Sequence, residues 1–250
     1  MMKLKITPQV RLEIESSIKK CKKRMVHALD DGFEYNRLAV PRSNRFLRKH
    51  DSEKMNMFVL FVDLGASTRM ISELSPDTLG KIIRLFSQEM AYVIEDHGGY
   101  VLKYIGDAVI GYFPADGMPQ VVAKKSIYCA LTMVTIIERA INPVLQETGY
   151  PQLKVKVSID LGENSIMRYG LDKKKSQIDI IGLAISLASK MLQGVEKPNH
   201  LIIGNQVYLK LPRHLKTCFK KLHTNTKTWS YHNFTSRRPY SIFLTRLYPV

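Results

Sequence analysis

The sequence predicts an α+β fold in which helices cover one face of a sheet, and three observations indicate it. Residues 57–62, MFVLFV, are a short and wholly apolar run, which is typical of a buried central strand. Residues 75–99 and about 119–148 have the apolar spacing of helices, whereas residues 100–113 and 153–160 have strand patterns. The resulting β-α-β-β-α-β order predicts a ferredoxin-like domain with an N-terminal helical extension and a C-terminal β-rich extension.

The first element is a predicted amphipathic helix within residues 1–35. Thr7 is placed as its N-cap, Pro8 at the first helical position and Gly32 at its end. One apolar stripe recurs at spacings of three and four residues: Val10, Ile14, Ile18, Cys21, Met25 and Leu29. This stripe must pack on its own domain or on a copy in a dimer, because a membrane-surface helix would carry aromatic anchors that are absent here.

The next segments define the predicted domain organisation. Residues 36–56 are polar and basic, include Pro41, and are interpreted as a connector. The central domain covers residues 57–210. Residues 211–250 are predicted to be basic strands, hairpin-like around 215–247, that complete or extend this domain.

Within the central domain, local signals place the helices. Ser75 caps a helix that begins at Pro76 and ends at the Gly98-Gly99 pair. After a lysine loop at 173–175, a helix near 182–194 and the strand LIIG are predicted.

The charge of the chain is concentrated at its two ends. The net charge is +16, of which +8 lies within residues 1–50 and +9 within 210–250, against −1 for residues 51–209. The basic ends could therefore contact an acidic partner. No nucleic-acid motif accompanies the charge, so nucleic-acid binding is disfavoured.

Cysteine usage and hydropathy point to a cytoplasmic protein. Cys21, Cys129 and Cys218 are odd in number and far apart, which indicates neither a disulfide framework nor a metal knuckle. We identify no signal peptide and no apolar stretch approaching the roughly 20 residues of a membrane helix. We therefore expect a reducing environment and no membrane span.

Two carboxylates are predicted to meet at the end of neighbouring strands. Asp63 ends the strand 57–62, and Asp107 lies at the turn of the hairpin 100–113, which we expect beside that strand. Two adjacent carboxylates repel each other unless a cation lies between them, and Mg²⁺ or Mn²⁺ prefers such oxygen ligands. Taken alone, a helix-capping or turn aspartate would explain either residue equally well.

Three segments together resemble the catalytic domain of class III nucleotidyl (adenylate/guanylate) cyclases. They are FVDLGAST at 61–68, GGYVLKYIGDAVIGYF at 98–113 and DIIGLAISLASKM at 179–191, in the order and at the separations of that family. The resemblance implies that residues 57–210 are a cyclase catalytic domain. It also implies two metal ions per site, Mg²⁺ or Mn²⁺, held by Asp63, Asp107 and the backbone carbonyl of Leu64.

The resemblance further assigns the substrate-binding residues. The phosphate loop would consist of small residues after the first strand: Leu64, Gly65, Ala66, Ser67 and Thr68. Lys103 and Asp179 match the residues that recognise the base. A lysine donates to N1 of adenine and a carboxylate accepts from the exocyclic amine, whereas guanine presents the opposite pattern, so the pair favours ATP over GTP.

In this family the active site lies between two chains, so the resemblance implies a homodimer. The activity that the resemblance implies is the conversion of ATP to 3′,5′-cyclic AMP and pyrophosphate. The transition-state residues of the family are asparagine and arginine, and here Ser186 and Lys190 stand at those positions. Serine is shorter, and lysine lacks the planar fork of arginine. Asp160 also stands where a histidine is common. A catalytically silent or weak cyclase-like regulatory module, dimerising through the N-terminal stripe, and a cyclase of GTP or a pyrimidine nucleotide are the alternatives.

Overall fold

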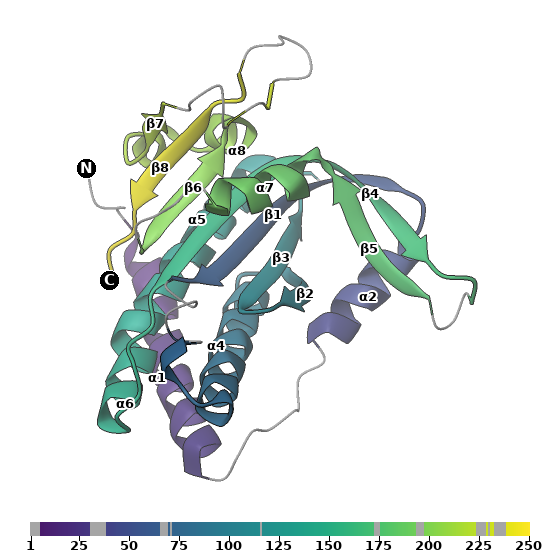
Figure 1. Ribbon diagram of the computed structural model, residues 1–250. Coiled ribbons are helices and arrows are strands. Elements are labelled where there is room, and N and C mark those ends of the chain that lie inside the picture. Colours follow the sequence, from purple (N-terminus) through teal and green to yellow (C-terminus); the bar gives the residue numbers. More distant parts are fainter. Residues whose placement is uncertain are drawn as a thin grey trace.

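The computed structural model describes most of the chain and gives one mixed α/β domain (Figure 1). The described residues are 6–30, 39–65, 70, 72–115, 117–172, 176–193, 198–223, 229, 231–232 and 239–250, without the side chains of residues 29 and 30. The predicted Gly32 stop and the lysine loop at 173–175 lie outside these residues.

A single twisted sheet forms the centre of the domain. Its strands are β1 (Lys54–Leu64), β2 (Tyr100–Ile105), β3 (Ala108–Pro114), β4 (Val155–Tyr169), β5 (Gln177–Gly182), β6 (His200–Gly204), β7 (Lys220–Leu222) and β8 (Ile242–Arg246). They lie in the order β2-β3-β1-β4-β6-β8-β7, and β5 pairs with β4 outside this path. The order β2-β3-β1-β4, with a helix after β1 and after β3, confirms the predicted βαββαβ unit.

Helices cover both faces of this sheet. The long helices are α1 (Pro8–Asp30), α4 (Pro76–Asp96) and a continuous run of α5 (Pro119–Ile136), the π-helical η1 (Ile137–Ile141) and α6 (Asn142–Glu147). They pack with Phe58, Leu60 and Val62 of β1 in one core. The opposite face, with Met57, Val59 and Phe61, packs against α2 (Ala39–Lys49) and α7 (Leu183–Gln193). The prediction of helices on one face only is therefore wrong, because α2 was not predicted and the predicted helix near 182–194, α7, lies on the opposite face.

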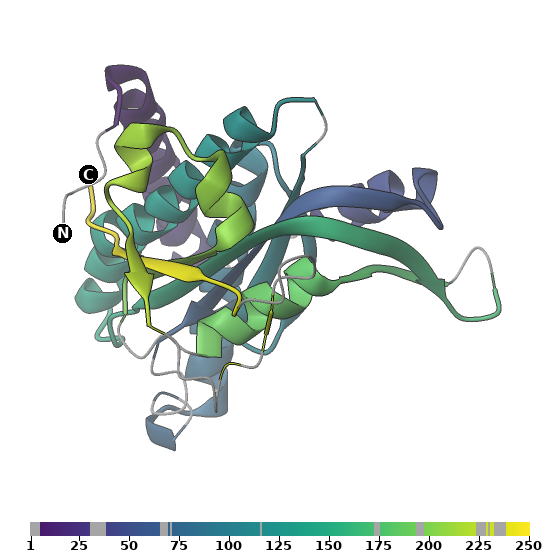
Figure 2. The same cartoon turned by 90° about the horizontal axis from the view of Figure 1, so that it is seen from above.

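Strand β4 is much longer than its predicted length and connects two parts of the domain. Its first half pairs in parallel with β6, and its second half pairs antiparallel with β5. The β4–β5 hairpin extends away from the long helices in both views (Figures 1 and 2).

Helix α1 buries its apolar stripe inside its own chain. Thr7 caps it, since its side-chain oxygen accepts a hydrogen bond from Val10 N at 3.3 Å. Ile14, Ile18 and Cys21 are at most 4% exposed in the core shared with α4 and α5. The stripe is therefore not available for dimerisation, which corrects that alternative.

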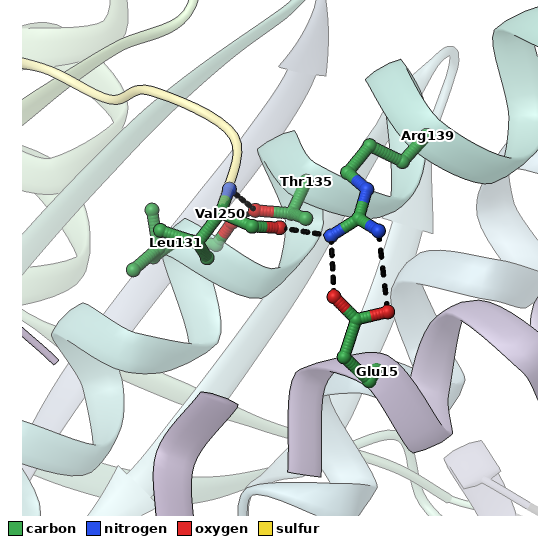
Figure 3. Close-up of polar contacts among 5 residues, drawn as sticks. All are labelled: Glu15, Leu131, Thr135, Arg139 and Val250. Carbon is green, nitrogen blue, oxygen red and sulfur yellow. Dashed lines mark hydrogen bonds and ion pairs between the residues drawn. The ribbon is translucent and has the colours of Figure 1, made fainter. Parts of the chain in front are cut away.

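The C-terminal end of the chain is attached to the same layer (Figure 3). Arg139 of η1 donates to both carboxylate oxygens of Glu15 in α1, at 2.6 and 3.2 Å, and also to the backbone oxygen of Val250. Val250 N donates to the hydroxyl of Thr135 at 3.4 Å. One guanidinium therefore links two segments that lie at opposite ends of the sequence.

Residues 36–56 are not simply a connector. Residues 39–49 form helix α2, and β1 begins at Lys54. Pro41 lies in the first turn of α2, where a backbone N–H has no hydrogen-bond partner within the helix, so its absence does not destabilise the helix. Pro41 is therefore part of the start of this helix and does not mark a loop.

The predicted basic strands of the C-terminal region are accompanied by helices. Residues 205–216 form the short helices α8 (Asn205–Lys210) and α9 (Arg213–Lys216), which the sequence analysis did not predict. The predicted hairpin-like strands are β7 and β8, which pair antiparallel, and β8 also pairs with β6.

One helix meets the length and composition of a membrane span, contrary to the expectation that no stretch approaches them. Among the described residues this is Pro119–Glu147, whose most apolar 18-residue window has a mean hydropathy of 1.3 and is 67% buried. Such burial is typical of the core helix of a folded domain.

Candidate active site

Strand pairing brings Asp63 and Asp107 to the same end of the sheet. β1 pairs antiparallel with β3, with Val62 opposite Val109, so Asp63 lies beside the turn that precedes β3. That turn is the two-residue link Gly106-Asp107, and Gly106 adopts φ +59°, which glycine tolerates best. The glycine makes the turn, and the aspartate faces the end of β1.

The two carboxylates are in electrostatic contact. Burial, and next the nearby charge of Asp107, raise the pKa of Asp63 to about 6. Oδ2 of Asp107 is buried and has no hydrogen-bond partner among the described residues. Two close, half-buried carboxylates with an unsatisfied oxygen fit a divalent cation with oxygen ligands.

Lys156 lies at this pair but is not among the predicted site residues. It lies opposite Asp63 on β4, and its Nζ is 3.8 Å from Asp63 Oδ2. Its side chain is only 21% exposed. A lysine between two buried valines was the only signal in the sequence, because the register of β4 against β1 is a long-range property.

The expected phosphate loop is described only at its start. Leu64 is the last residue of β1, and Gly65 N donates to the Lys154 carbonyl at 2.7 Å. Ala66, Ser67 and Thr68 lie outside the described residues.

Lys103 and Asp179 meet although 76 positions separate them. Lys103 Nζ donates to Asp179 Oδ2, and Asp179 Oδ1 accepts from Ile180 N at 2.9 Å. Their side chains are 32% and 14% exposed, so solvent or a ligand can reach the lysine. Lysine keeps two further N–H donors and the carboxylate keeps free lone pairs, so the pair can still bind a base edge.

Ser186 and Lys190 lie one turn apart on the exposed face of α7. The hydroxyl of Ser186 donates to the Gly182 carbonyl at 3.0 Å, within the first turn of the helix. Leu187 and Ala188 anchor the helix on the sheet, and the Ala188 carbonyl accepts from Ser158 Oγ at 2.7 Å. Lys190 is exposed on this anchored helix.

Over the described residues, no group of three or more His, Cys, Asp or Glu side chains is arranged to hold a metal. A cation at the Asp63–Asp107 pair would therefore need main-chain, water or substrate oxygens to complete its coordination. This is common for Mg²⁺ that binds together with phosphates.

A cavity of about 920 Å³ lies elsewhere, between β4, α7 and α8. Its described lining includes Asp160 and Tyr240 and none of the predicted site residues. The carboxylate pair of the candidate site thus lies at the ends of neighbouring strands and not in the described lining of this cavity.

Asp160, at the border of that cavity, is 1% exposed. Its Oδ1 accepts from Tyr240 OH at 2.7 Å and from Leu161 N at 2.9 Å. Burial raises the pKa of Asp160 to about 7, although both hydrogen bonds oppose that shift.

We expect Asp160→Asn to flatten the pH dependence of stability. The unfolded chain loses this proton near pH 4 and the folded chain only near pH 7, so the group's contribution to the free energy of unfolding falls by about 4 kcal/mol as pH rises between them. Asparagine keeps an acceptor for Tyr240 and removes the ionisation. Urea unfolding at pH 5 and pH 8 without divalent ions measures the change.

Tyr240→Phe is the matched control for this experiment. It removes the donor that favours the charged form, so stability should continue to fall to a higher pH. An unchanged pH profile in Asp160→Asn would contradict the assignment.

The strand order and the positions of these residues are those expected of a nucleotidyl cyclase domain, and comparison with known families supports the same class. The family model of the adenylate and guanylate cyclase catalytic domain matches residues 50–228. The chain therefore belongs to the class III nucleotidyl cyclase family.

Several curated relatives differ in the nucleotide that they are named for. Adenylate cyclase of Anabaena cylindrica is 28% identical over 56% of this chain and 27% of its own length. A uridylate cyclase of Rhodovulum sp. is 25% identical over 61% and 64%, and a cytidylate cyclase of Staphylococcus aureus is 23% identical over 63% and 38%. The chain thus spans less than two thirds of the length of each of these relatives.

Solved structures share the fold at low identity. The adenylyl cyclase CyaB from P. aeruginosa is 20% identical, with a TM-score of 0.63 over 77% of this chain and 94% of that chain. The guanylyl cyclase Cya2 is 18% identical, with a TM-score of 0.62 over 77% and 92%.

Proposed function

We propose that this protein is an adenylate cyclase that converts ATP to 3′,5′-cyclic AMP and pyrophosphate. The observation that carries the proposal is the Asp63–Asp107 pair, in which burial and mutual repulsion raise the pKa of Asp63 to about 6. A folded chain gains nothing from such repulsion unless a cation relieves it. A catalytically silent module would have no use for this pair.

Asp63, Asp107 and the Leu64 carbonyl would hold Mg²⁺ or Mn²⁺. When bound, these ions supply a lowered pKa for the ribose 3′-hydroxyl and neutralise phosphate charge. In the proposed reaction the 3′-hydroxyl would lose its proton to solvent, and its oxygen would attack the α-phosphorus. The bond from that phosphorus to the oxygen bridging to the β-phosphate would break, and pyrophosphate would leave. The two carboxylates would hold the ions in place, and the substrate oxygens that bind these ions would then be held in a fixed orientation for the reaction.

Lys156 and the start of the phosphate loop would bind the triphosphate. The ammonium group of Lys156 is 3.8 Å from Asp63 Oδ2, so it adds a positive charge next to the carboxylate pair. A compact ammonium suits phosphate oxygens that are not held in one plane. Backbone N–H groups after Gly65 would supply further donors.

Ser186 and Lys190 would act on the ribose and on the charge of the transition state. Both lie on one exposed face of α7, so they can reach a ligand bound outside this chain's own core. Lys190 offers a point charge where an arginine would offer two parallel donors, which predicts weaker transition-state stabilisation than in the family.

The site would be completed by a second copy of the chain, with the metal pair from one copy and Lys103, Asp179, Ser186 and Lys190 from the other. A two-fold interface then contains two identical sites.

We also propose a cytoplasmic, reducing setting, because Cys21, Cys129 and Cys218 are all buried free thiols.

For the choice of base, one alternative to ATP has its own support. Adenine and cytosine both present a ring-nitrogen acceptor beside an amine donor, so Lys103 and Asp179 suit CTP as well as ATP. Relatives named as uridylate and cytidylate cyclases favour a pyrimidine nucleotide as the second candidate.

One assay tests this proposal. Purified protein is incubated with Mn²⁺ or Mg²⁺ and with ATP, GTP, CTP and UTP in turn, and products are identified by mass spectrometry. Cyclic AMP as the main product supports the proposal. A cyclic pyrimidine product or cyclic GMP would overturn the ATP assignment while keeping the cyclase, and no cyclic product from any nucleotide would overturn both.

We expect Lys103→Glu combined with Asp179→Cys to weaken ATP use. These are the residue types that guanylate cyclases of the family carry at the two positions. The change removes the donor for N1 and the acceptor for the amine, which should lower kcat/KM for ATP by roughly a hundredfold and raise the share of GTP turnover. Steady-state kinetics with both nucleotides measure it. If ATP turnover is unaffected, these residues do not contact the base.

A further inference from the structure

The two residues expected to recognise the base lie on strands that do not pair with each other. Among the described strands β2 pairs with β3 and β5 pairs with β4, and three strands (β3, β1 and β4) separate β2 from β5 in the sheet. The direct contact between Lys103 and Asp179 therefore depends on how far the β4–β5 hairpin bends over the face of β2. One partly buried lysine ion pair is too weak to set that distance alone.

Helix α2 is fixed to β2 at its N-terminal end. The guanidinium of Arg42 lies over the Tyr100 ring at 4.6 Å, and its Nη1 donates to the Gly99 carbonyl at 3.4 Å. Phe46 stacks on the same Tyr100 ring, with centroids 4.6 Å apart and an angle of 28°. Tyr100 precedes Lys103 by three residues on the same strand.

The C-terminal end of α2 is fixed to the segment that leads into β5. Arg48 Nη2 donates to the Ser176 backbone oxygen, and its Nη1 lies 3.4 Å from the Ser176 hydroxyl. Ser176 is 4% exposed and precedes Asp179 by three residues. Between the two ends, Leu47 is fully buried in one cluster with Leu102 of β2 and with Ile178 and Ile180 of β5.

A bulge in β2 adds to this dependence on packing. The register of β2 against β3 shifts between Val101 and Lys103, so the position of Lys103 is set by the intervening Leu102 as well as by strand pairing. Leu102 is 4% exposed and packs in the same cluster as Leu47. Helix α2 thus supports the position of Lys103 through the neighbouring Leu102, and that of Asp179 through Ser176.

We propose that α2 is a clamp that sets the separation of Lys103 and Asp179, and that Phe46 and Arg48 are positioning residues for the choice of nucleotide base. The proposal rests on the proposed function and deepens it. Residues 39–49 lie outside the segment matched by the family model, which begins at residue 50. The proposed clamp therefore lies just before the matched cyclase domain in the sequence.

The test compares Arg48→Met with Arg45→Met. Both changes remove a guanidinium from α2 and keep an apolar stem, but Arg45 is exposed whereas Arg48 bonds to Ser176. In Arg48→Met we expect KM for the preferred nucleotide to rise about fivefold with kcat changed less than about twofold, and the preference over the other three nucleotides to narrow. Arg45→Met should behave as wild type.

Hydrogen exchange gives a readout that does not need enzyme activity. Amides of residues 100–105 and 177–182 should exchange faster in Arg48→Met, while those of 155–160, which carry Lys156, should not change. Phe46→Leu keeps the buried apolar contact and loses the stacking, so it should loosen 100–105 more than 177–182.

These readouts separate failure of the clamp from failure of the proposed function. If the chain makes no cyclic product, faster exchange at both strands together with altered affinities for ATP, GTP, CTP and UTP by calorimetry still supports the clamp. Unchanged exchange in Arg48→Met and in Phe46→Leu overturns it. Faster exchange with unchanged base preference also overturns it, because α2 would then only stabilise the fold. If Arg48→Met does not fold, Arg48→Lys replaces it with the same expected direction, because it keeps one charged donor group but loses the two-nitrogen fork that reaches both oxygens of Ser176.

Discussion

Asp107→Ala is expected to lower cyclase turnover by roughly a hundredfold to a thousandfold, and Asp63→Ala to do the same. Each change removes one of the two carboxylates that would anchor the metal ions, while the strands on either side keep their pairing. Steady-state rates at saturating Mn²⁺ measure the loss. Because both side chains sit at strand ends rather than in the core, circular dichroism should show the folded domain in both variants.

The same carboxylate pair also predicts an effect on the stability of the fold, which can be measured without any enzyme activity. Burial and repulsion raise the pKa of Asp63 to about 6, so the folded state loses stability as pH rises from about 4 to above 6 when no metal is bound. Asp63→Asn should therefore be about 1–3 kcal/mol more stable than wild type at pH 8 with a chelator present. Adding Mn²⁺ should raise the melting temperature of wild type and leave that of the variant unchanged. Equal metal stabilisation of both proteins would place the metal elsewhere.

Mixing two inactive chains is expected to restore about a quarter of wild-type activity if subunits exchange at random. One chain carries Asp107→Ala, and the other carries Lys103→Ala with Asp179→Ala. Half of the resulting dimers are mixed, and each mixed dimer has one interface that combines the intact metal pair with the intact base-recognising pair. Activity after co-refolding, with heterodimers counted by native mass spectrometry, measures the effect.

A matched mixture distinguishes this arrangement from simple restabilisation. Asp107→Ala mixed with Asp63→Ala should remain inactive, because neither chain offers a complete metal pair. Activity in that mixture, or no recovery in the first mixture when heterodimers are present, would show that the halves of the site are not divided between chains as proposed.

The candidate site was predictable where its geometry depends on short stretches of chain. Asp63 follows an apolar strand and Asp107 follows a glycine in a two-residue turn, so both positions are set by local strand and turn chemistry. Their adjacency then needed only the pairing of β1 with β3. The roles of Lys103, Asp179, Ser186 and Lys190 came from the family resemblance, and the structure adds that the first two are in contact.

Lys156 and helix α2 were not predictable in the same way. Lys156 contributes only because the register of β4 places it opposite Asp63, across 93 positions of sequence. Residues 39–49 have few apolar side chains, which suggested a connector, yet Leu47, Phe46 and Ser43 find partners on β2, β3 and β5. Burial of a few side chains overrode the weak local pattern.

The sequence by itself determined the βαββαβ order, the strand-end carboxylate pair and the apolar stripe of α1, because periodicity, glycine turns and capping residues act over a few neighbouring positions. Only the tertiary structure decided that the stripe of α1 is covered by its own domain, that Asp160 is buried against Tyr240, and that α2 bridges the strands of Lys103 and Asp179. These features depend on contacts between residues far apart in the chain. Their energies arise from register, burial and charge at close range, and no short segment of the sequence contains both partners.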